Sequence, residues 1–281
     1  MRKILSLLIC LAVGFGLAAG TAGTAEEPVR VIFFDVGKGD CILVSRGGCH
    51  ALIDAGYAET AEDVTGWIRE AGAERLDAVI LTHYDKDHVG GAIAVLESFP
   101  AEKIYLPGYQ GEGKYYEGIM EAVRTRGLPA EKVTEDVRFS LGGVDFEIFA
   151  SKVAYIPSDG EKEGNDNDTS LAVAATYGKD TFLFAGDIEE EGINSYLAAG
   201  HGQYDVVKMP HHGQNEKNSD DLIEQVRMKI AVVTDSWEEP IKKKMRKQLA
   251  AVGAEIYCSS ENGTITVTGT GTGEYSVETE R

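Results

Sequence analysis

The sequence is poor in basic residues and in cysteine. Its 27 lysines and arginines stand against 46 aspartates and glutamates, which gives a formal net charge of −19. So acidic a chain does not favour holding a long nucleic acid by broad electrostatic attraction alone. Cys10 lies in an apolar N-terminal stretch, and the odd number that remains, Cys41, Cys49 and Cys258, cannot pair completely within the chain. The cysteines therefore indicate no disulfide framework.

The motifs of several enzyme classes are missing as well. No Gly-x-Ser-x-Gly segment is present to carry a serine nucleophile, and the neighbours Cys49 and His50 fall in a turn without further catalytic context. Residues 37–39 lack the spacing of a glycine-rich phosphate loop. Beyond the N-terminal stretch, no apolar run approaches the length that spans a bilayer. These absences leave no protein nucleophile in view.

The N-terminus has the pattern of a secretory signal peptide. Basic residues at positions 2 and 3 precede an apolar stretch over residues 4–17, and small residues follow up to Ala25. This order of charged, apolar and small segments predicts a signal peptide over residues 1–25. The remaining residues, 26–281, are enough for a single domain of the larger α/β kind. The chain is therefore predicted to be secreted, with no stable membrane span after cleavage, or to stay at the cell surface if the segment is retained as an anchor.

Histidine is rare, and its distribution indicates a metal site. Of six histidines, His83 and His88 share one short segment with Asp85 and Asp87, directly after the apolar run over residues 76–81. That run predicts a buried strand, and a strand that ends in a loop of ligands holds them on a rigid frame. The alternative is an acidic, solvated loop with two incidental histidines. We interpret the segment as metal-binding because imidazole and carboxylate groups are typical metal ligands.

Strand and helix patterns are mixed in both halves of the chain. Strands are expected over residues 31–34, 41–45, 51–54, 76–81, 104–106, 170–177, 181–185, 205–209, 230–234, 255–257 and 264–268, with a hairpin over 139–149. Helices are expected over residues 60–71, 91–99, 115–126, 189–199, 220–227 and 240–252, with Thr60 and Pro240 at the start of the first and the last. This mixture predicts two packed sheets with helices outside.

The segment over residues 83–88 resembles the signature of the metallo-β-lactamase superfamily, His-x-His-x-Asp-His, with Asp85 where the second histidine usually stands. This variant is similar to a narrower group, the hydrolase domain of the competence proteins that take up DNA. Further segments of that group occur in the same order, over residues 33–40, 52–56, 168–171, 182–187 and 206–213. The resemblance spans most of the chain after residue 28 and implies an α/β fold, an αββα sandwich of two mixed sheets with outer helices.

The resemblance implies one complete metal site. It assigns Asp187 as a carboxylate between two ions, together with Asp87, His88 and one of two adjacent histidines. From the residues alone, Asp187 follows an apolar strand but could equally cap the next helix. Because adjacent residues at a strand end point in different directions, we assign His212 to the metal and His211 to the substrate or leaving group. Asp87 and His211 are the catalytic candidates, although His211 could also be merely packed.

The same mapping gives a second, poorer site from His83, Asp85 and Asp187. Its usual third histidine has no counterpart, since none occurs between residue 149 and Asp187. Asp166, Asp168 or water could fill the gap, whereas most of the acidic loop around them is expected to be solvated. The extra oxygen ligand suits Mn²⁺ or Mg²⁺, while the first site suits Zn²⁺. We therefore predict Zn²⁺ or Mn²⁺ as the cofactor, with one ion held tightly and one weakly.

Several other polar residues have structural explanations. Asp35 and Asp40 flank a tight turn and could be turn formers. For Asp54 we favour a role in orienting the metal-binding loop. His50 and His201 have no partners in the sequence and are expected to be ordinary surface or half-buried histidines.

The predicted reaction is hydrolysis by a metal-activated water, because a bound cation lowers the pKa of water toward ~7. The resemblance implies a secreted phosphodiesterase that acts on DNA or on another phosphodiester. Asp85 disfavours a β-lactamase. Residues 235–240 stand in place of the Asn-x-Tyr-Gly-His-Pro segment of the competence group, which weakens the assignment of DNA but not of the metal. The alternatives are an enzyme like the phosphorylcholine esterases of teichoic acids and a non-catalytic secreted binding protein on a hydrolase scaffold.

Overall fold

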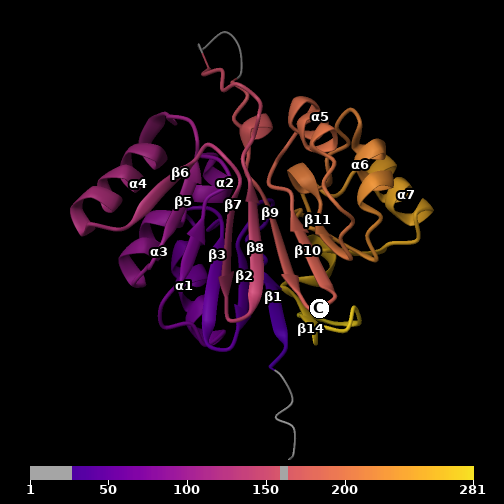
Figure 1. The fold of residues 1–281 in the computed structure, drawn as a ribbon, viewed down its shortest axis with the longest axis horizontal. Coiled ribbons are helices and arrows are strands. Elements are labelled where there is room, and N and C mark those ends of the chain that lie inside the picture. Colours follow the sequence, from indigo (N-terminus) through magenta and orange to yellow (C-terminus); the bar gives the residue numbers. More distant parts are fainter. Residues whose placement is uncertain (1–26, 159–163) are drawn as a thin grey trace, which may run out of the picture.

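The structure, a computed structural model, describes residues 27–158 and 164–281. Two β-sheets lie against each other, and helices cover the outer side of each (Figure 1). The predicted signal peptide over residues 1–25 lies outside the described residues. Within the described part, no helix combines the length and the apolar character that crossing a membrane requires.

The first sheet has eight strands in the order β15-β14-β1-β2-β3-β4-β5-β6. Its strands are β1 (Val29–Phe33), β2 (Ile42–Arg46), β3 (Cys49–Ile53), β4 (Ala78–Ile80), β5 (Ile104–Pro107), β6 (Ala130–Val133), β14 (Ile265–Gly269) and β15 (Tyr275–Thr279). Pairing is antiparallel from β15 to β3 and parallel from β3 to β6. The sheet is therefore mixed, and its parallel half requires crossover connections.

The second sheet has seven strands in the order β13-β12-β11-β10-β9-β8-β7. Its strands are β7 (Val137–Leu141), β8 (Val144–Phe149), β9 (Ala172–Tyr177), β10 (Asp180–Phe184), β11 (Val206–Lys208), β12 (Ile230–Val233) and β13 (Glu255–Cys258). Pairing is antiparallel from β7 to β10 and parallel from β10 to β13. This sheet is mixed too, as predicted.

The helices form the two outer layers. They are α1 (Ala61–Glu70), α2 (Lys86–Val89), α3 (Ala92–Ser98), α4 (Gly113–Arg126), α5 (Glu190–Ala199), α6 (Ser219–Val226), α7 (Lys243–Ala251) and α8 (Ser259–Asn262), with 3₁₀ turns η1 (Asn167–Thr169) and η2 (Pro210–Gly213). Figure 1 shows α1, α3 and α4 on one side of the sheets and α5, α6 and α7 on the other. The predicted αββα sandwich is confirmed.

Burial on both faces explains why the central strands are nearly continuous apolar runs. In β3, Ile53 packs between the two sheets, whereas its neighbour Leu52 packs under the outer helices with Ile68 of α1. In β10, Phe184 packs between the sheets and Leu183 packs with Ile193 of α5. The strands therefore form a rigid frame, and the loops at their ends inherit fixed positions.

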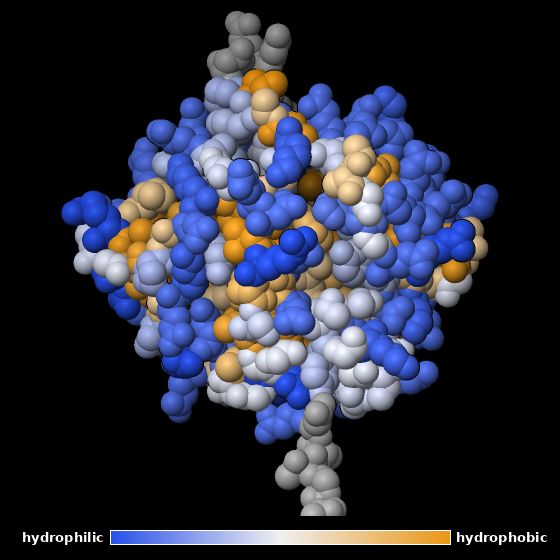
Figure 2. Space-filling model, in the orientation of Figure 1, coloured by the Kyte–Doolittle hydropathy of each residue, from blue (hydrophilic) through white to orange (hydrophobic). Residues whose placement is uncertain are grey.

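The surface has few large apolar side chains. Hydrophilic residues cover most of the face in Figure 2, and apolar residues gather in its middle, where β7 and β8 run in Figure 1. Among the described residues, the exposed large apolar side chains are Ile156, Trp237 and Val252. They belong to three separate segments, and scattered side chains of this kind need no partner to explain them.

The predicted site residues follow strands that end at one edge of the sandwich. His83 follows β4, and Asp54 follows β3, which pairs parallel with β4. Asp187 follows β10, and His212 follows β11, which pairs parallel with β10. Because parallel strands end on the same side of a sheet, each sheet brings its polar residues to one edge, where open α/β sheets bind ligands.

The start of the last long helix was predicted wrongly. The last long helix begins at Lys243, not at Pro240, because Ile241 N donates to Asp235 Oδ2 at 2.7 Å and Lys242 N to Gly213 O at 3.2 Å. These bonds keep the chain extended past Pro240. The first helix starts as predicted, with Thr60 directly before α1, although the Thr60 hydroxyl donates to Tyr57 O at 3.2 Å and makes no capping bond to the helix.

The predicted hairpin over residues 139–149 is confirmed as β7 and β8, which turn at Gly142 and Gly143 with φ of 56° and 78°. Glycine adopts this left-handed conformation without strain. The described cysteines, Cys41, Cys49 and Cys258, are free, in agreement with the absence of a disulfide framework.

Candidate metal centre

Four side chains from three separate segments meet at the shared edge of the sheets. Asp87 and His88 come from α2, Asp187 from the loop after β10, and His212 from η2. Each offers one ligand atom, and these atoms all lie within 4.8 Å of one another. His88 and His212 are fully buried and Asp187 is 3% exposed. The structure thus brings together the four residues that the sequence assigned to the complete site.

The spacing of the ligand atoms fits a tetrahedral cation. His88 Nε2 lies 3.4 Å from His212 Nε2 and 3.2 Å from Asp187 Oδ1. His212 Nε2 lies 3.0 Å from Asp187 Oδ2 and 3.5 Å from Asp87 Oδ2. Ligands about 2.0–2.1 Å from a tetrahedral Zn²⁺ lie about 3.3–3.4 Å from one another. The donor set and its geometry therefore suit Zn²⁺ or a cation of similar size.

The first two ligands lie on a single helical turn held by its own backbone and by the turn before β2. Asp85 O accepts from His88 N at 3.0 Å and from Val89 N at 2.9 Å, and Asp87 O accepts from Asp40 N at 3.1 Å. A Cβ atom on Gly39 would lie 2.5 Å from Asp87 O. Only glycine therefore allows the two turns to approach so closely.

Asp54 orients His88, as the sequence suggested. Asp54 Oδ2 accepts from His88 Nδ1 at 2.7 Å, and the same carboxylate accepts from both Thr82 N (2.8 Å) and Thr82 Oγ1 (2.7 Å). With its Nδ1 held by Asp54, the imidazole directs Nε2 toward the cluster. Carboxylates behind metal-binding histidines act in this way.

His212 is oriented by a relay that the sequence did not reveal. Thr234 Oγ1 donates to Asp40 Oδ1 at 2.7 Å, and its oxygen lies 3.1 Å from His212 Nδ1. Because the hydroxyl proton is used on Asp40, His212 must donate from Nδ1 and present Nε2 to the cluster. The prediction of Asp40 as a turn former is wrong, since its side chain is only 2% exposed and contacts Lys208 and His212 at the centre. For Asp35 it is confirmed, because Asp35 Oδ1 accepts from Gly37 N at 3.3 Å.

Lys208 is a second residue that the sequence analysis missed. It is fully buried between Asp40 and Asp187. Burial lowers the pKa of Lys208, but the two carboxylates outweigh this effect and raise it. Desolvation costs several kcal/mol for each buried ion unless partners compensate it. The ammonium group therefore belongs to the charge balance of the centre.

The buried carboxylates and imidazoles shift one another's pKa strongly. Burial would raise the pKa of Asp187, yet His212, His88 and Lys208 hold it well below its usual value. Burial would lower the pKa of His88, yet Asp187, Asp54 and Asp40 hold it well above 6.5. The pKa of His212 is raised in the same way, chiefly by Asp187. Without metal the centre thus retains protons that a bound cation would displace.

We expect the metal-free protein to lose stability as the pH rises above about 6.5. Folding raises the pKa of His88 and of His212. Each protonated imidazole therefore stabilises the folded protein fully at a pH below the pKa that it has in the unfolded chain. This stabilisation is lost as the pH rises through the higher pKa of the folded state. A bound cation displaces these protons, so the loss should vanish with Zn²⁺. Denaturant unfolding between about pH 6 and 9, with EDTA or with Zn²⁺, measures this. Stability in EDTA that rises over this range would contradict the expectation.

Asp187 does not cap the next helix. The residue before α5 is Glu189, and the amides of Glu189 and Gly192 donate to Asp168 Oδ1 at 3.1 and 2.7 Å. Asp168 Oδ1 therefore stabilises the start of α5, and Asp168 joins no compact group of potential metal ligands among the described residues. Asp187 is instead placed by its own amide, which donates to Ser170 Oγ at 3.3 Å.

The second site is only partly assembled. His83 Nδ1 lies 3.0 Å from Thr82 Oγ1, and its buried Nε2 has no hydrogen-bond partner among the described residues. Burial lowers the pKa of His83 to about 4, so the ring stays neutral and can act as a ligand. The carboxylate oxygen nearest to His83 Nε2 is Asp85 Oδ2, at 3.9 Å. In residues 27–158 and 164–281, neither Asp187 nor Asp166 completes a compact three-ligand group with this pair.

From this arrangement we expect one tightly bound and one weakly bound ion. Asp87, His88, Asp187 and His212 offer four protein ligands, whereas His83 and Asp85 offer two. Metal analysis after exhaustive dialysis should find about one ion for each chain, with a second appearing only when metal is added in excess. Equal retention of two ions would contradict the expectation.

The two neighbouring histidines of η2 point to different surroundings. Both have left-handed backbones, with φ of 44° for His211 and 52° for His212. Such strain costs on the order of 1–3 kcal/mol per residue and concentrates at functional sites. His212 is fully buried in the cluster, while the His211 side chain is 21% exposed. His211 Nδ1 lies 2.9 Å from Glu216 Oε1 and 3.2 Å from Glu189 Oε1.

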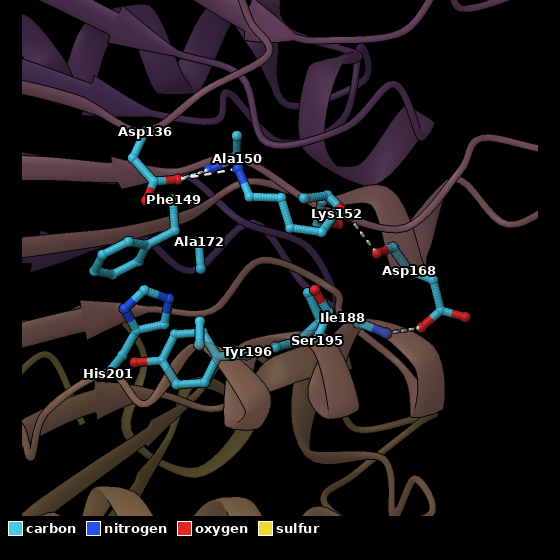
Figure 3. A pocket seen from close by; sticks show the side chains of 14 residues that line it. Asp136, Phe149, Ala150, Lys152, Asp168, Ala172, Ile188, Ser195, Tyr196 and His201 are labelled. Atoms are coloured by element: carbon cyan, nitrogen blue, oxygen red, sulfur yellow. Dashed lines mark hydrogen bonds and ion pairs between the residues drawn. The ribbon is translucent and has the colours of Figure 1, made fainter.

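His201 lines a separate pocket (Figure 3). In this view His201 packs against Phe149 and Tyr196, with ring centroids 3.9 and 4.7 Å apart. The predicted half-buried role of His201 is confirmed, and none of the four clustered residues lines the pocket. His50 is buried rather than half-exposed, with Nδ1 2.9 Å from Ser45 Oγ. Neither histidine belongs to the metal centre.

The chain is similar to known proteins over the region that contains the four clustered residues. The model of the Metallo-beta-lactamase superfamily matches residues 34–233, which include all four clustered residues. ComE operon protein 3 of Bacillus subtilis (strain 168) is 25% identical over 283 residues, which cover 92% of this chain and 35% of that protein. Competence protein ComA of Neisseria gonorrhoeae is 28% identical over 220 residues, which cover 77% and 28%. The chain spans about a third of the length of these curated relatives.

Solved structures with the same fold include the metallo-β-lactamase fold protein YhfI from Bacillus subtilis, with a TM-score of 0.55 and 13% identity, covering 84% of this chain and 98% of that one. Zn²⁺-bound PqqB from Methylobacterium extorquens has a TM-score of 0.53 and 14% identity, covering 82% and 97%. At these identities the likeness concerns the fold alone, and it agrees with the αββα sandwich described above.

Proposed function

The chain belongs to the metallo-β-lactamase superfamily, and from this membership we propose that it is a metal-dependent phosphodiesterase. The observation that carries the proposal is the buried group Asp87, His88, Asp187 and His212, whose ligand atoms lie within 4.8 Å of one another. A scaffold that only binds a partner has no need of such a group. The intact group therefore supports an enzyme over a non-catalytic binding protein.

We propose Zn²⁺ or Mn²⁺ as the cofactor. When bound, such a cation lowers the pKa of a water ligand and stabilises charge on a phosphoryl oxygen. Asp54 and Thr234 hold the two imidazoles with Nε2 toward the centre. The side chain of Asp87 is the most exposed of the four, at 18%, so its carboxylate is assigned to orient the attacking water.

His211 is proposed as the proton donor to the leaving oxygen. Its ring lies beside the centre and is accessible to solvent, unlike the ring of His212. Glu216 and Glu189 contact Nδ1 of His211, so they fix the orientation of the ring. Their carboxylates can also balance the positive charge of the protonated imidazole before it gives up its proton. Carboxylates support catalytic histidines in this way in many hydrolases.

DNA is the proposed substrate, because one of the relatives above is a competence protein and the sequence pattern around residues 83–88 resembles that group. The net charge of −19 argues against wide contacts with a duplex. We therefore propose that a strand is engaged locally at the centre. The N-terminal pattern over residues 1–25 leads us to propose that the chain acts outside the cell, which N-terminal sequencing of protein from the culture medium tests.

The decisive experiment is a substrate screen with defined metal content. The full chain is stripped with EDTA, reloaded with Zn²⁺, Mn²⁺ or Mg²⁺, and assayed on bis-p-nitrophenyl phosphate, DNA, RNA, phosphorylcholine esters and a β-lactam. We expect metal-dependent cleavage of the phosphodiesters, unaffected by His50→Ala, whose ring lies outside the centre. Turnover of phosphorylcholine esters alone would favour the cell-wall alternative. Bound metal without any turnover would support a binding protein.

A further inference from the structure

Lys208 occupies an unusual place for a lysine. It is the last residue of β11, and none of its surface is exposed. Its Nζ lies 2.5 Å from Asp40 Oδ2, 3.2 Å from Asp187 Oδ1 and 3.0 Å from Gly186 O. An ammonium group has three donors, and these three acceptors use all of them. Complete burial leaves Lys208 without access to a substrate, so any role that it has is exerted through its neighbours.

The most important neighbour is Asp187, whose two oxygens are already engaged. Oδ2 lies 3.0 Å from His212 Nε2, and Oδ1 lies 3.2 Å from His88 Nε2. A second ion on the side of His83 would need an oxygen of Asp187 as a shared ligand, because His83 and Asp85 alone offer two ligands. Lys208 Nζ lies 3.2 Å from Oδ1, so its positive charge opposes the binding of a second cation to the same oxygen.

We propose that Lys208 is a positioning residue that supplies to Asp187, from inside the protein, the positive charge that a second metal ion would otherwise supply, and so limits the centre to one tightly bound ion. The proposal rests on the metal centre put forward above, and it gives the weakness of the second site a cause beyond its missing histidine. A site limited in this way needs metal less for its folding, because part of the carboxylate charge is balanced internally.

Lys208 also reaches the opposite side of the centre. Lys208 contacts Asp40, and Asp40 accepts a hydrogen bond from Thr234. The Thr234 hydroxyl in turn contacts Nδ1 of the ligand His212. One ammonium group therefore positions a carboxylate ligand directly and an imidazole ligand through two intermediates. Such connected outer contacts commonly change metal affinity by about 10–100-fold when they are removed.

The test compares Lys208→Met with the double variant Asp40→Asn/Lys208→Met. The double variant removes the ammonium group without leaving the buried Asp40 carboxylate unpaired, so it keeps the test valid if the single variant fails to fold. Lys229→Met is the matched control, because Lys229 pairs with Asp205 at the opposite end of the second sheet and its side chain is 57% exposed. For each protein we would titrate Mn²⁺, count bound ions, and record electron paramagnetic resonance spectra, in which two neighbouring Mn²⁺ ions differ from one.

We expect the wild type and Lys229→Met to give the spectrum of isolated Mn²⁺ at one equivalent and to bind a second ion weakly. The double variant should bind the second ion at least about 10-fold more tightly and show coupling between two ions. Thermal unfolding of the double variant should also depend more strongly on added metal. A folded double variant with the wild-type affinity for the second ion would overturn the role of Lys208. Wild-type protein that binds no ion at all would instead overturn the proposed function.

Discussion

Asp187→Asn should remove metal and phosphodiester turnover together while the fold survives. Asp187 contributes an oxygen on each side, 3.2 Å from His88 Nε2 and 3.0 Å from His212 Nε2, so it is central to the four-residue group. Asparagine has the same shape but loses the negative charge that balances the cation and Lys208. Because even outer contacts of metal sites change affinity by about 10–100-fold, loss of a ligand charge should exceed that range.

The measurements are metal content after dialysis, turnover of bis-p-nitrophenyl phosphate, and the circular dichroism of the folded protein. Asp220→Asn is the matched control, since Asp220 is exposed on α6 and the substitution is identical. It should retain metal and turnover. An Asp187→Asn protein with wild-type metal content and wild-type turnover would exclude Asp187 from the centre.

Much of the fold could be predicted because buried strands and helices have a recognisable pattern of apolar residues in the sequence. The strands β3, β4, β10 and β12 are short apolar runs, and the sequence placed each of them within a few residues. The strands β6 (Ala130–Val133) and β15 (Tyr275–Thr279) were missed because each lies at a sheet edge and leaves most of its residues exposed or only partly buried. An edge strand that buries little side-chain surface has no strong hydrophobic pattern, so it resembles a loop.

The ligands were predictable for a related reason. His83, Asp85, Asp87 and His88 are close in sequence and follow an apolar strand, so the chain itself brings them together. Asp54 was predictable because it ends the strand that pairs parallel with β4, and so it must lie behind the same loop.

The residues behind His212 could not be found in this way, because their contacts join distant parts of the chain. Thr234 and Asp40 are 194 positions apart, yet their side chains form a 2.7 Å hydrogen bond. Lys208 did leave one signal, a lysine within the apolar run before the paired histidines. A lysine in a strand that is otherwise buried needs a carboxylate partner. That reasoning would have pointed to Lys208, though not to Asp40.

The paired histidines should respond differently to substitution. His212→Ala removes a buried nitrogen ligand, so metal affinity should fall by roughly 10-fold or more. His211→Ala should leave metal bound but lower turnover by roughly 10²–10⁴-fold, the range expected when a proton donor is lost. The geometry supports this division, because His212 Nε2 lies 3.0 Å from Asp187 Oδ2 whereas the Nδ1 atom of His211 faces Glu216 at 2.9 Å.

Bound metal and phosphodiester turnover should be measured for each single variant, with His201→Ala as the control, because the ring of His201 packs on Phe149 away from the cluster. Loss of metal in His211→Ala but not in His212→Ala would reverse the assignment. A substrate with a better leaving group should be affected less by His211→Ala, because its departing oxygen needs no proton. An equal loss for good and poor leaving groups would show that His211 binds the substrate and does not donate a proton.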